Sequence, residues 1–183
     1  SDDPASKSRS HSNALYRRML QLGKVALSEA CEAANIKAPI PIFLATPEQR
    51  CGRPFPALEP ILKDLASEVD FPIDLLTSRI FPLGRAAGIN AMEEAVNLLL
   101  TTPLENIIVG AVDSFLDIMF LSALDAEDRL TSNTTMRGFV PGEGAAFVVL
   151  KKTAEPGVIV GQPTTSKEPG HYYSDDVCLG DGL

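Results

Sequence analysis

Residues 84–114 read GRAAGINAMEEAVNLLLTTPLENIIVGAVDS and decide the fold that we expect for this chain. After a start of small residues, apolar side chains recur at the spacing of one helical face, at Ile89, Met92, Val96 and Leu99. Pro103 ends this helix, which we expect over residues 84–102. Residues 106–112 form a continuous apolar run of strand length, typical of a strand covered on both faces. The stretch therefore predicts a helix followed by a buried strand.

The same alternation of helix-like and strand-like segments continues on both sides of this stretch. Strands are expected near residues 41–46, 78–82, 106–112, 145–150 and 158–161. Helices are expected near residues 14–35, 56–69, 84–102 and 115–124. Helices that alternate with apolar strands favour an α/β fold, with one mixed sheet covered by helices on both faces.

The ends of the chain are polar. Residues 1–13 predict a flexible tail, after which Ser12 or Asn13 caps the first helix. Around Pro156 and Gly157 the sequence predicts a turn, which would make residues 145–161 a hairpin. The remainder, 162–183, is polar and irregular.

Composition excludes several classes of protein. The chain has 183 residues, 45% of them hydrophobic, and a formal net charge of −8, so it is globular and unsuited to nucleic acid. Its apolar runs are shorter than the roughly 20 residues that span a bilayer. The polar start has no signal-peptide pattern, so we expect a cytoplasmic protein without a membrane partner.

Few cysteines and histidines in the chain are suited to metal binding or to catalysis. Three cysteines, Cys31, Cys51 and Cys178, stand far apart, which argues against disulfides and structural zinc. Neither His11 nor His171 has a partner at metal-ligand spacing. We therefore expect a reducing compartment, no bound metal and no cofactor.

Several smaller patterns have two interpretations each. Arg50 and Arg53 would lower the pKa of Cys51, but a loop cysteine without a base is more often an ordinary thiol. The group at 171–173 could line a pocket or cover the edge of a core, and the carboxylates at 175–181 could bind a cation or face solvent. Arg17 and Arg18 could meet a phosphate or form a solvated helix face.

A second pattern, GFVPGEGAAFVVL at 138–150, joins the first in one resemblance. Together they resemble the N-terminal half of a β-ketoacyl synthase, a condensing enzyme of the thiolase fold. In that family, a turn that ends in glycine comes before a central helix, and Gly88 matches this glycine. The strand that follows the helix ends in a motif that residues 110–113, Gly-Ala-Val-Asp, resemble. Its Gly-Phe-x-x-Gly-Glu-Gly-Ala motif matches 138–145. The resemblance covers residues 14–161 and implies half of a thiolase-like fold, with 162–183 leading to the second half.

The nucleophile position departs from this family. Counted from Gly88, the cysteine of the family is replaced by Arg85, whose guanidinium stays protonated and accepts no acyl group. The catalytic His and Lys of the family belong to a second half, and its opening strand is not recognisable here. The resemblance thus implies no catalytic residue in this chain, and ligand-contacting positions at Arg85, Gly88, Phe139, Gly142 and Gly144.

Two of these glycines belong to the segment Gly142-Glu143-Gly144, which comes before a strand. A phosphate loop comes before a helix, so we do not expect a nucleotide here. The resemblance explains the glycines by close approach to the nucleophile's turn. For Arg85, a cation at a helix start, we expect an anionic partner such as Glu93, Glu143 or a ligand, or else exposure to solvent.

Two functional hypotheses follow, and a plain structural α/β domain is a weaker third. The first is a non-catalytic β-ketoacyl-synthase-like protein of fatty acid or polyketide-type biosynthesis, acting as a partner subunit or as a module that binds acyl groups or acyl carrier protein. The second is an active condensing enzyme or acyltransferase completed by residues outside this chain. Because half of the fold would leave the helix at 84–102 poorly covered, we expect a homodimer or a complex with a second condensing-enzyme subunit.

Overall fold

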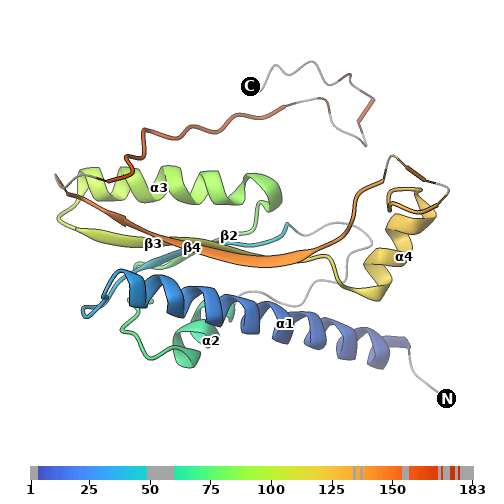
Figure 1. The fold of residues 1–183 in the computed structure, drawn as a ribbon, viewed down its shortest axis with the longest axis horizontal. Helices are drawn as coiled ribbons and strands as arrows, with labels where there is room; N and C mark the ends of the chain where they lie inside the picture. Colours follow the sequence, from blue (N-terminus) through green and yellow to red (C-terminus); the bar gives the residue numbers. More distant parts are fainter. Residues whose placement is uncertain are drawn as a thin grey trace.

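A computed structural model describes residues 4–48, 60–133, 135–136, 138–153, 157–168, 170, 174–175 and 177, with side chains from residue 14 onward. Figure 1 shows one sheet between two layers of helices. The elements follow in the order α1 (Pro4–Ala33), β1 (Ile42–Ala45), α2 (Ile61–Glu68), β2 (Arg79–Phe81), the 3₁₀ turn η1 (Gly84–Ala86), α3 (Ala87–Thr101), β3 (Asn106–Ser114), α4 (Ile118–Ala126) and β4 (Glu143–Lys151).

The sheet has four strands in the order β2-β1-β3-β4. β1 runs parallel to both β2 and β3, with Ala45 beside Phe81 and Ala111. β4 runs antiparallel to β3, with Phe147 opposite Gly110. The sheet is therefore mixed, as the sequence predicts, and the carboxyl ends of β1, β2 and β3 meet at one edge.

One face of the sheet is covered by α1 and α2. Ile42 and Leu44 of β1 and Ile108 of β3 point to this face and have no exposed surface. They pack against the apolar stripe of α1, which includes Leu15, Met19 and Leu27, and against Ile61 and Leu65 of α2. Alternate residues of a strand point to opposite faces of the sheet, so the remaining side chains of β1 point to the other face.

The second layer is α3, which contacts the sheet through small residues. Its buried positions are Ala87, Ala91, Ala95 and Leu99, which pack on Phe43 and Val109. Of the predicted stripe, Leu99 is buried and Met92 packs partly buried against the same cluster, while Ile89 is 47% exposed. Small side chains at every fourth position let the helix lie close to the sheet. The prediction of helices on both faces of a mixed α/β sheet is confirmed.

Two predicted boundaries are wrong. Helix α1 begins at Pro4, so helical backbone extends into the predicted tail and the cap at Ser12 or Asn13 is not used. Residues 158–161 do not form a strand, so the predicted hairpin over 145–161 is absent. Instead, this segment runs along the outer side of α3 (Figure 1), where Gln162 donates a hydrogen bond to Asn97 at 3.0 Å and Thr165 to Glu93 at 3.0 Å.

The remaining predicted elements are present with different bounds. β3 and β4 extend beyond the predicted 106–112 and 145–150, and the helix predicted at 56–69 appears as α2, with residues 56–59 outside the described part of the chain. Strands predicted at 41–46 and 78–82 appear as β1 and β2, and the helix predicted at 115–124 appears as α4. The stretch 84–102 begins as the turn η1 before it becomes α3. No helix among the described residues is both long and apolar enough to cross a membrane.

Candidate functional site

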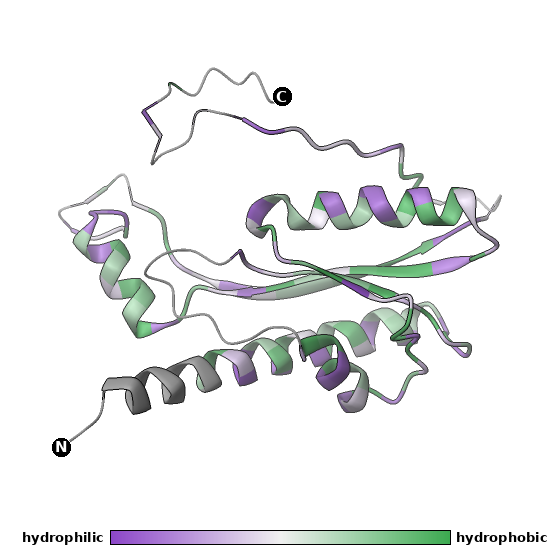
Figure 2. Ribbon diagram, turned by 180° about the vertical axis from the view of Figure 1, so that it is seen from behind, coloured by the Kyte–Doolittle hydropathy of each residue, from purple (hydrophilic) through white to green (hydrophobic). Residues whose placement is uncertain are grey.

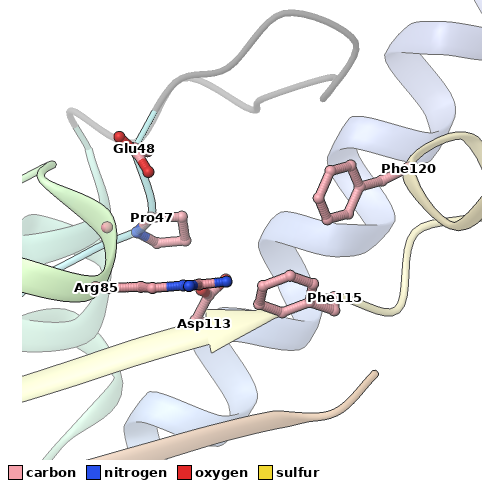
Figure 3. A pocket seen from close by; sticks show the side chains of 7 residues that line it. Pro47, Glu48, Arg85, Asp113, Phe115 and Phe120 are labelled. Carbon is pink, nitrogen blue, oxygen red and sulfur yellow. The ribbon is translucent and has the colours of Figure 1, made fainter. Parts of the chain in front are cut away.

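A small cavity lies at the sheet edge where the parallel strands end and α3 begins (Figure 3). Its walls come from segments far apart in sequence, namely Pro47, Glu48, Gly84, Arg85, Asp113, Phe115 and Phe120. The cavity has a volume of about 30 Å³. Since a water molecule needs at least about 10–15 Å³ by this measure, the space suits one or two water molecules.

The backbone at Gly84 brings Arg85 to this cavity. Gly84 has a positive φ of 60°, a conformation that other residues rarely adopt, and its N–H donates to the carbonyl of Thr46 at 3.2 Å. A Cβ at position 84 would lie 2.9 Å from Oε1 of Glu48. The backbone conformation therefore favours glycine at the residue before Arg85, and a side chain there would also displace the carboxylate of Glu48.

Arg85 shares the cavity with two carboxylates. It is an exposed residue of η1, while Glu48 follows β1 and Asp113 lies near the end of β3. The carboxylates predicted as its partners are elsewhere: Glu143 is bonded to Arg18, and Glu93 accepts from Thr165. The acidic groups that face the same space as Arg85 are therefore Glu48 and Asp113.

Three phenylalanines enclose one side of this site. The ring of Phe115 lies 5.5 Å from that of Phe120 and 5.7 Å from that of Phe139, the latter edge-on. Asp117 holds Phe120 in place, because its carboxylate accepts the backbone N–H of Phe120 at 2.9 Å and so caps α4. Of the predicted ligand-contacting residues, Phe139 thus contacts Phe115 of the cavity wall and is not itself among the lining residues.

The predicted glycines do not line this cavity. Gly88 lies in the first turn of α3, Gly142 comes just before β4, and Gly144 is within β4. A Cβ at any of the three would meet open space. The predicted close approach at Gly142 and Gly144 is therefore wrong, and the carbonyl of Gly142 instead accepts the N–H of Phe115 at 3.0 Å. As predicted, this segment comes before a strand.

The described part of the chain contains one cysteine, Cys31, and it is buried in α1. Burial raises the pKa of its thiol to about 11, so it is protonated at neutral pH and a poor nucleophile. Cys51, Cys178 and His171 lie outside the described residues. Within the described residues, no three His, Cys, Asp or Glu side chains are placed to hold a metal ion.

Glu143 belongs to a second polar cluster, on the α1 face of the sheet. Arg18 of α1 donates from Nε to Oε1 of Glu143 at 2.7 Å, and the hydroxyl of Ser114 lies 3.1 Å from Oε2. These hydrogen bonds, with that from Arg18 the largest effect, lower the pKa of Glu143. Arg18 therefore links α1 to the first residue of β4, a contact that neither interpretation of Arg17 and Arg18 includes.

We expect this cluster to make stability depend on acid pH. A carboxylate whose pKa is lowered by folding stabilises the native state above its unfolded pKa, and this stabilisation is lost as pH falls through the folded pKa. Glu143→Gln should therefore reduce the loss of stability between about pH 7 and about pH 3 in urea unfolding. Glu32→Gln, an exposed change on α1, is the control and should behave as wild type. An unchanged pH profile in Glu143→Gln would contradict this role.

Sequence reasoning identifies Arg85 but misses most of the residues around it. It does not single out Pro47, Glu48 or Phe120 as site residues, and it includes Asp113 only as part of a strand-end motif. These residues could have been identified from their position in the sequence, because residues that directly follow parallel strands lie together at one edge of the sheet. Applied to β1 and β3, that rule indicates residues 46–48 and 112–115.

No protein-family model matches the chain, and no curated protein matches it either. Among solved structures, the chain is similar to a ketosynthase from module 6 of the bacillaene synthase of Bacillus subtilis 168, a cysteine-to-serine mutant. The similarity has a TM-score of 0.45 and 19% sequence identity, and covers 75% of this chain and 26% of the ketosynthase. This chain therefore spans about a quarter of that protein's length.

Proposed function

We propose that the chain is a β-ketoacyl-synthase-like protein of fatty acid or polyketide-type biosynthesis that performs no condensation itself and acts as a partner subunit. The observation that carries the proposal is Arg85. Counted from Gly88, the nucleophile position of the resembled family falls at this residue. In the fold, Arg85 stands at the start of α3 and lines the cavity at the strand ends.

The chemistry of arginine opposes an acyl-transfer role at this position. A nucleophile at a helix start gains from the partial positive charge there, because a thiolate is favoured beside free N–H groups. A guanidinium remains a cation at neutral pH and has no free electron pair with which to attack a thioester. Arg85 therefore cannot carry an acyl intermediate.

The size of the cavity supports a partner subunit over a module that binds acyl groups at Arg85. About 30 Å³ holds one or two water molecules and leaves no room for an acyl chain. Glu48 and Asp113 also face this space, and their carboxylates would repel a fatty carboxylate or a phosphate unless Arg85 bound it with two hydrogen bonds.

The surface beside the site also supports a protein partner. Helix α4 is strongly apolar, as its mostly green ribbon in Figure 2 shows, yet Leu124 is its one buried residue. Ile118 and Met119 are 59% and 57% exposed, and the preceding Leu116 is 51% exposed. Clustered exposed apolar side chains are typical of surfaces that bind another protein.

The proposal predicts that the chain forms no covalent acyl intermediate. Incubation with acyl thioesters, or with the ketosynthase inhibitor cerulenin, should leave the intact mass unchanged, because Arg85 cannot be acylated and Cys31 is buried. Mass spectrometry of the intact protein measures this directly. Stoichiometric labelling that maps to Cys51 or Cys178 would contradict the proposal and favour an active enzyme.

Two further experiments test the role of Arg85 itself. Arg85→Cys restores a thiol at the helix start and should remain unlabelled, since the general acid and base groups of the resembled family belong to its second half. Calorimetric titration of wild type and Arg85→Ala with phosphopantetheine tests the remaining prediction that Arg85 binds an anion. Equal heats for the two proteins would show that it does not.

A further inference from the structure

Among the described residues, no strand pairs with the outer edge of β4. This strand has nine residues, ends the sheet on one side, and lies at the front of the sheet in Figure 1. Six consecutive residues, 145–150, are apolar, yet every residue of the strand keeps some exposed surface. A long apolar edge strand is a template for pairing with another strand, and proteins that stay monomeric usually blunt such edges.

The hydrogen bonds to β3 show which backbone groups of β4 point outward. Lys152 donates its N–H to Glu105 at 2.8 Å, and Gly142 accepts from Phe115, so the even-numbered residues bond toward β3. In an antiparallel ladder the intervening residues direct both N–H and C=O to the other side. The outward-facing residues are therefore Glu143, Ala145, Phe147, Val149 and Lys151.

We propose that β4 pairs antiparallel with β4 of a second copy of the chain, about a two-fold axis at Phe147. The strand, EGAAFVVLK, has small residues before Phe147 and large ones after it. Paired with itself about Phe147, it places Gly144, Ala145 and Ala146 opposite Leu150, Val149 and Val148 of the other copy. Glu143 then lies opposite Lys151 at both ends, so charges and sizes are complementary throughout.

The same pairing satisfies the hydrogen-bond alternation. About Phe147, each odd-numbered residue of one strand faces an odd-numbered residue of the other, and these are the residues that direct N–H and C=O outward. A register shifted by one residue would place them opposite residues already bonded to β3. The register favoured by side-chain size and charge is thus one that the backbone permits.

Helix α1 carries a matching stripe beside this edge. A groove of about 490 Å³ lies between α1 and β4, lined by Arg18, Gln21, Leu22, Val25, Ala26, Glu29, Gly144 and Ala145. Val25 is 60% exposed there. The two-fold axis that pairs the strands sets the two α1 helices antiparallel on the same face of the combined sheet. Exposed apolar side chains of this groove, such as Val25, would then lie on the side of the second copy.

The opposite sheet edge differs from β4. β2 has three residues, and its first residue, Arg79, forms an ion pair with Glu94 of α3. The Arg79 guanidinium also lies 5.5 Å from the centre of the Phe43 ring. A short edge strand with a charged side chain offers little for strand pairing. The proposed interface rests on the sheet alone and is independent of the proposed function.

The test is the oligomeric state together with amide exchange. Sedimentation velocity from about 1 to 100 µM should show a dimer whose fraction rises with concentration. Hydrogen exchange should show that the outward amides of Ala145, Phe147 and Val149 gain protection over the same range. A protein that stays monomeric at all concentrations would overturn the proposal. If these amides were protected in that monomer, another segment of the same chain would cover the edge.

Two variants and one control locate the interface. Ala145→Pro removes an outward N–H without affecting the ladder to β3, and should weaken the dimer roughly tenfold or more. Lys151→Glu places a carboxylate opposite Glu143 of the other copy at both ends of the paired strands, and should weaken the dimer roughly tenfold. Lys152→Glu makes the same charge change at the residue after the strand, whose side chain donates to the carbonyl of Leu99 in α3, and should leave the dimer constant unchanged. Equal weakening by the two lysine variants would refute this register.

Discussion

Phe43→Ala is expected to lower the free energy of unfolding by about 3–5 kcal/mol, the cost of removing a buried aromatic side chain and leaving a cavity. Phe43 lies in β1, between β2 and β3, and has no exposed surface. Its ring packs 5.4 Å from that of Phe81 and against the alanines of α3. Because these neighbours belong to the sheet and a helix, they cannot move far enough to fill the space.

Urea unfolding of the wild type and the variant measures this change. Leu76→Ala provides the control, because Leu76 is 99% exposed and should lose less than about 0.5 kcal/mol. A loss below about 1 kcal/mol for Phe43→Ala would mean that α3 does not pack on the sheet as described. The variant thus tests the contact between the two layers on which the position of Arg85 depends.

The strands that sequence reasoning predicts correctly are those with continuous apolar runs. Residues 41–46 and 106–112 carry few polar side chains because β1 and β3 are covered on both faces, and such runs have few alternatives in a globular chain. The segment 158–161 is also apolar but does not pair with β4. The predicted hairpin is therefore wrong: β4 ends at Lys151, and Pro156 of the predicted turn lies outside the described residues.

The predicted face of α3 is partly wrong, because the most hydrophobic side chains of this helix are not the ones closest to the sheet. Ile89, Met92 and Val96 are larger than the alanines, but Ala87, Ala91 and Ala95 make the sheet contact. At a close helix–sheet contact, packing selects small side chains, and periodicity alone does not distinguish the two stripes. The predicted start of α1 is wrong for a related reason, since residues 4–13 lack an apolar stripe and yet continue the helix.

For the candidate site, sequence reasoning locates Arg85 at a helix start but does not identify its surroundings. Glu48 and Asp113 are far apart in the chain, and only the parallel pairing of β1 with β3 brings the two strand ends together. The roles predicted for the glycines are wrong because a glycine in a motif does not say which neighbour requires it. Gly142 and Gly144 have free space, whereas Gly84 and Gly110 do not.

Gly110 is expected to tolerate no side chain, for a reason that comes from the β3–β4 register. It lies directly opposite Phe147, and a Cβ at position 110 would be 1.9 Å from Cδ1 of that ring. Gly110→Ala should therefore lower the free energy of unfolding by about 1–3 kcal/mol, the usual cost of overpacking. Ala111→Ser, at the adjacent and exposed position, should cost less than about 0.5 kcal/mol in the same urea unfolding experiment.

The double variant Gly110→Ala with Phe147→Ala separates this steric contact from a general weakness of β3. Without the ring, the methyl group at position 110 has room, so Phe147→Ala should cost less when Gly110→Ala is already present than in the wild type. The coupling free energy should be at least about 1 kcal/mol, within the range for residues in contact. Additive costs would show that the two residues are not opposed, and the two motifs at 110–113 and 138–145 would then not meet through this register.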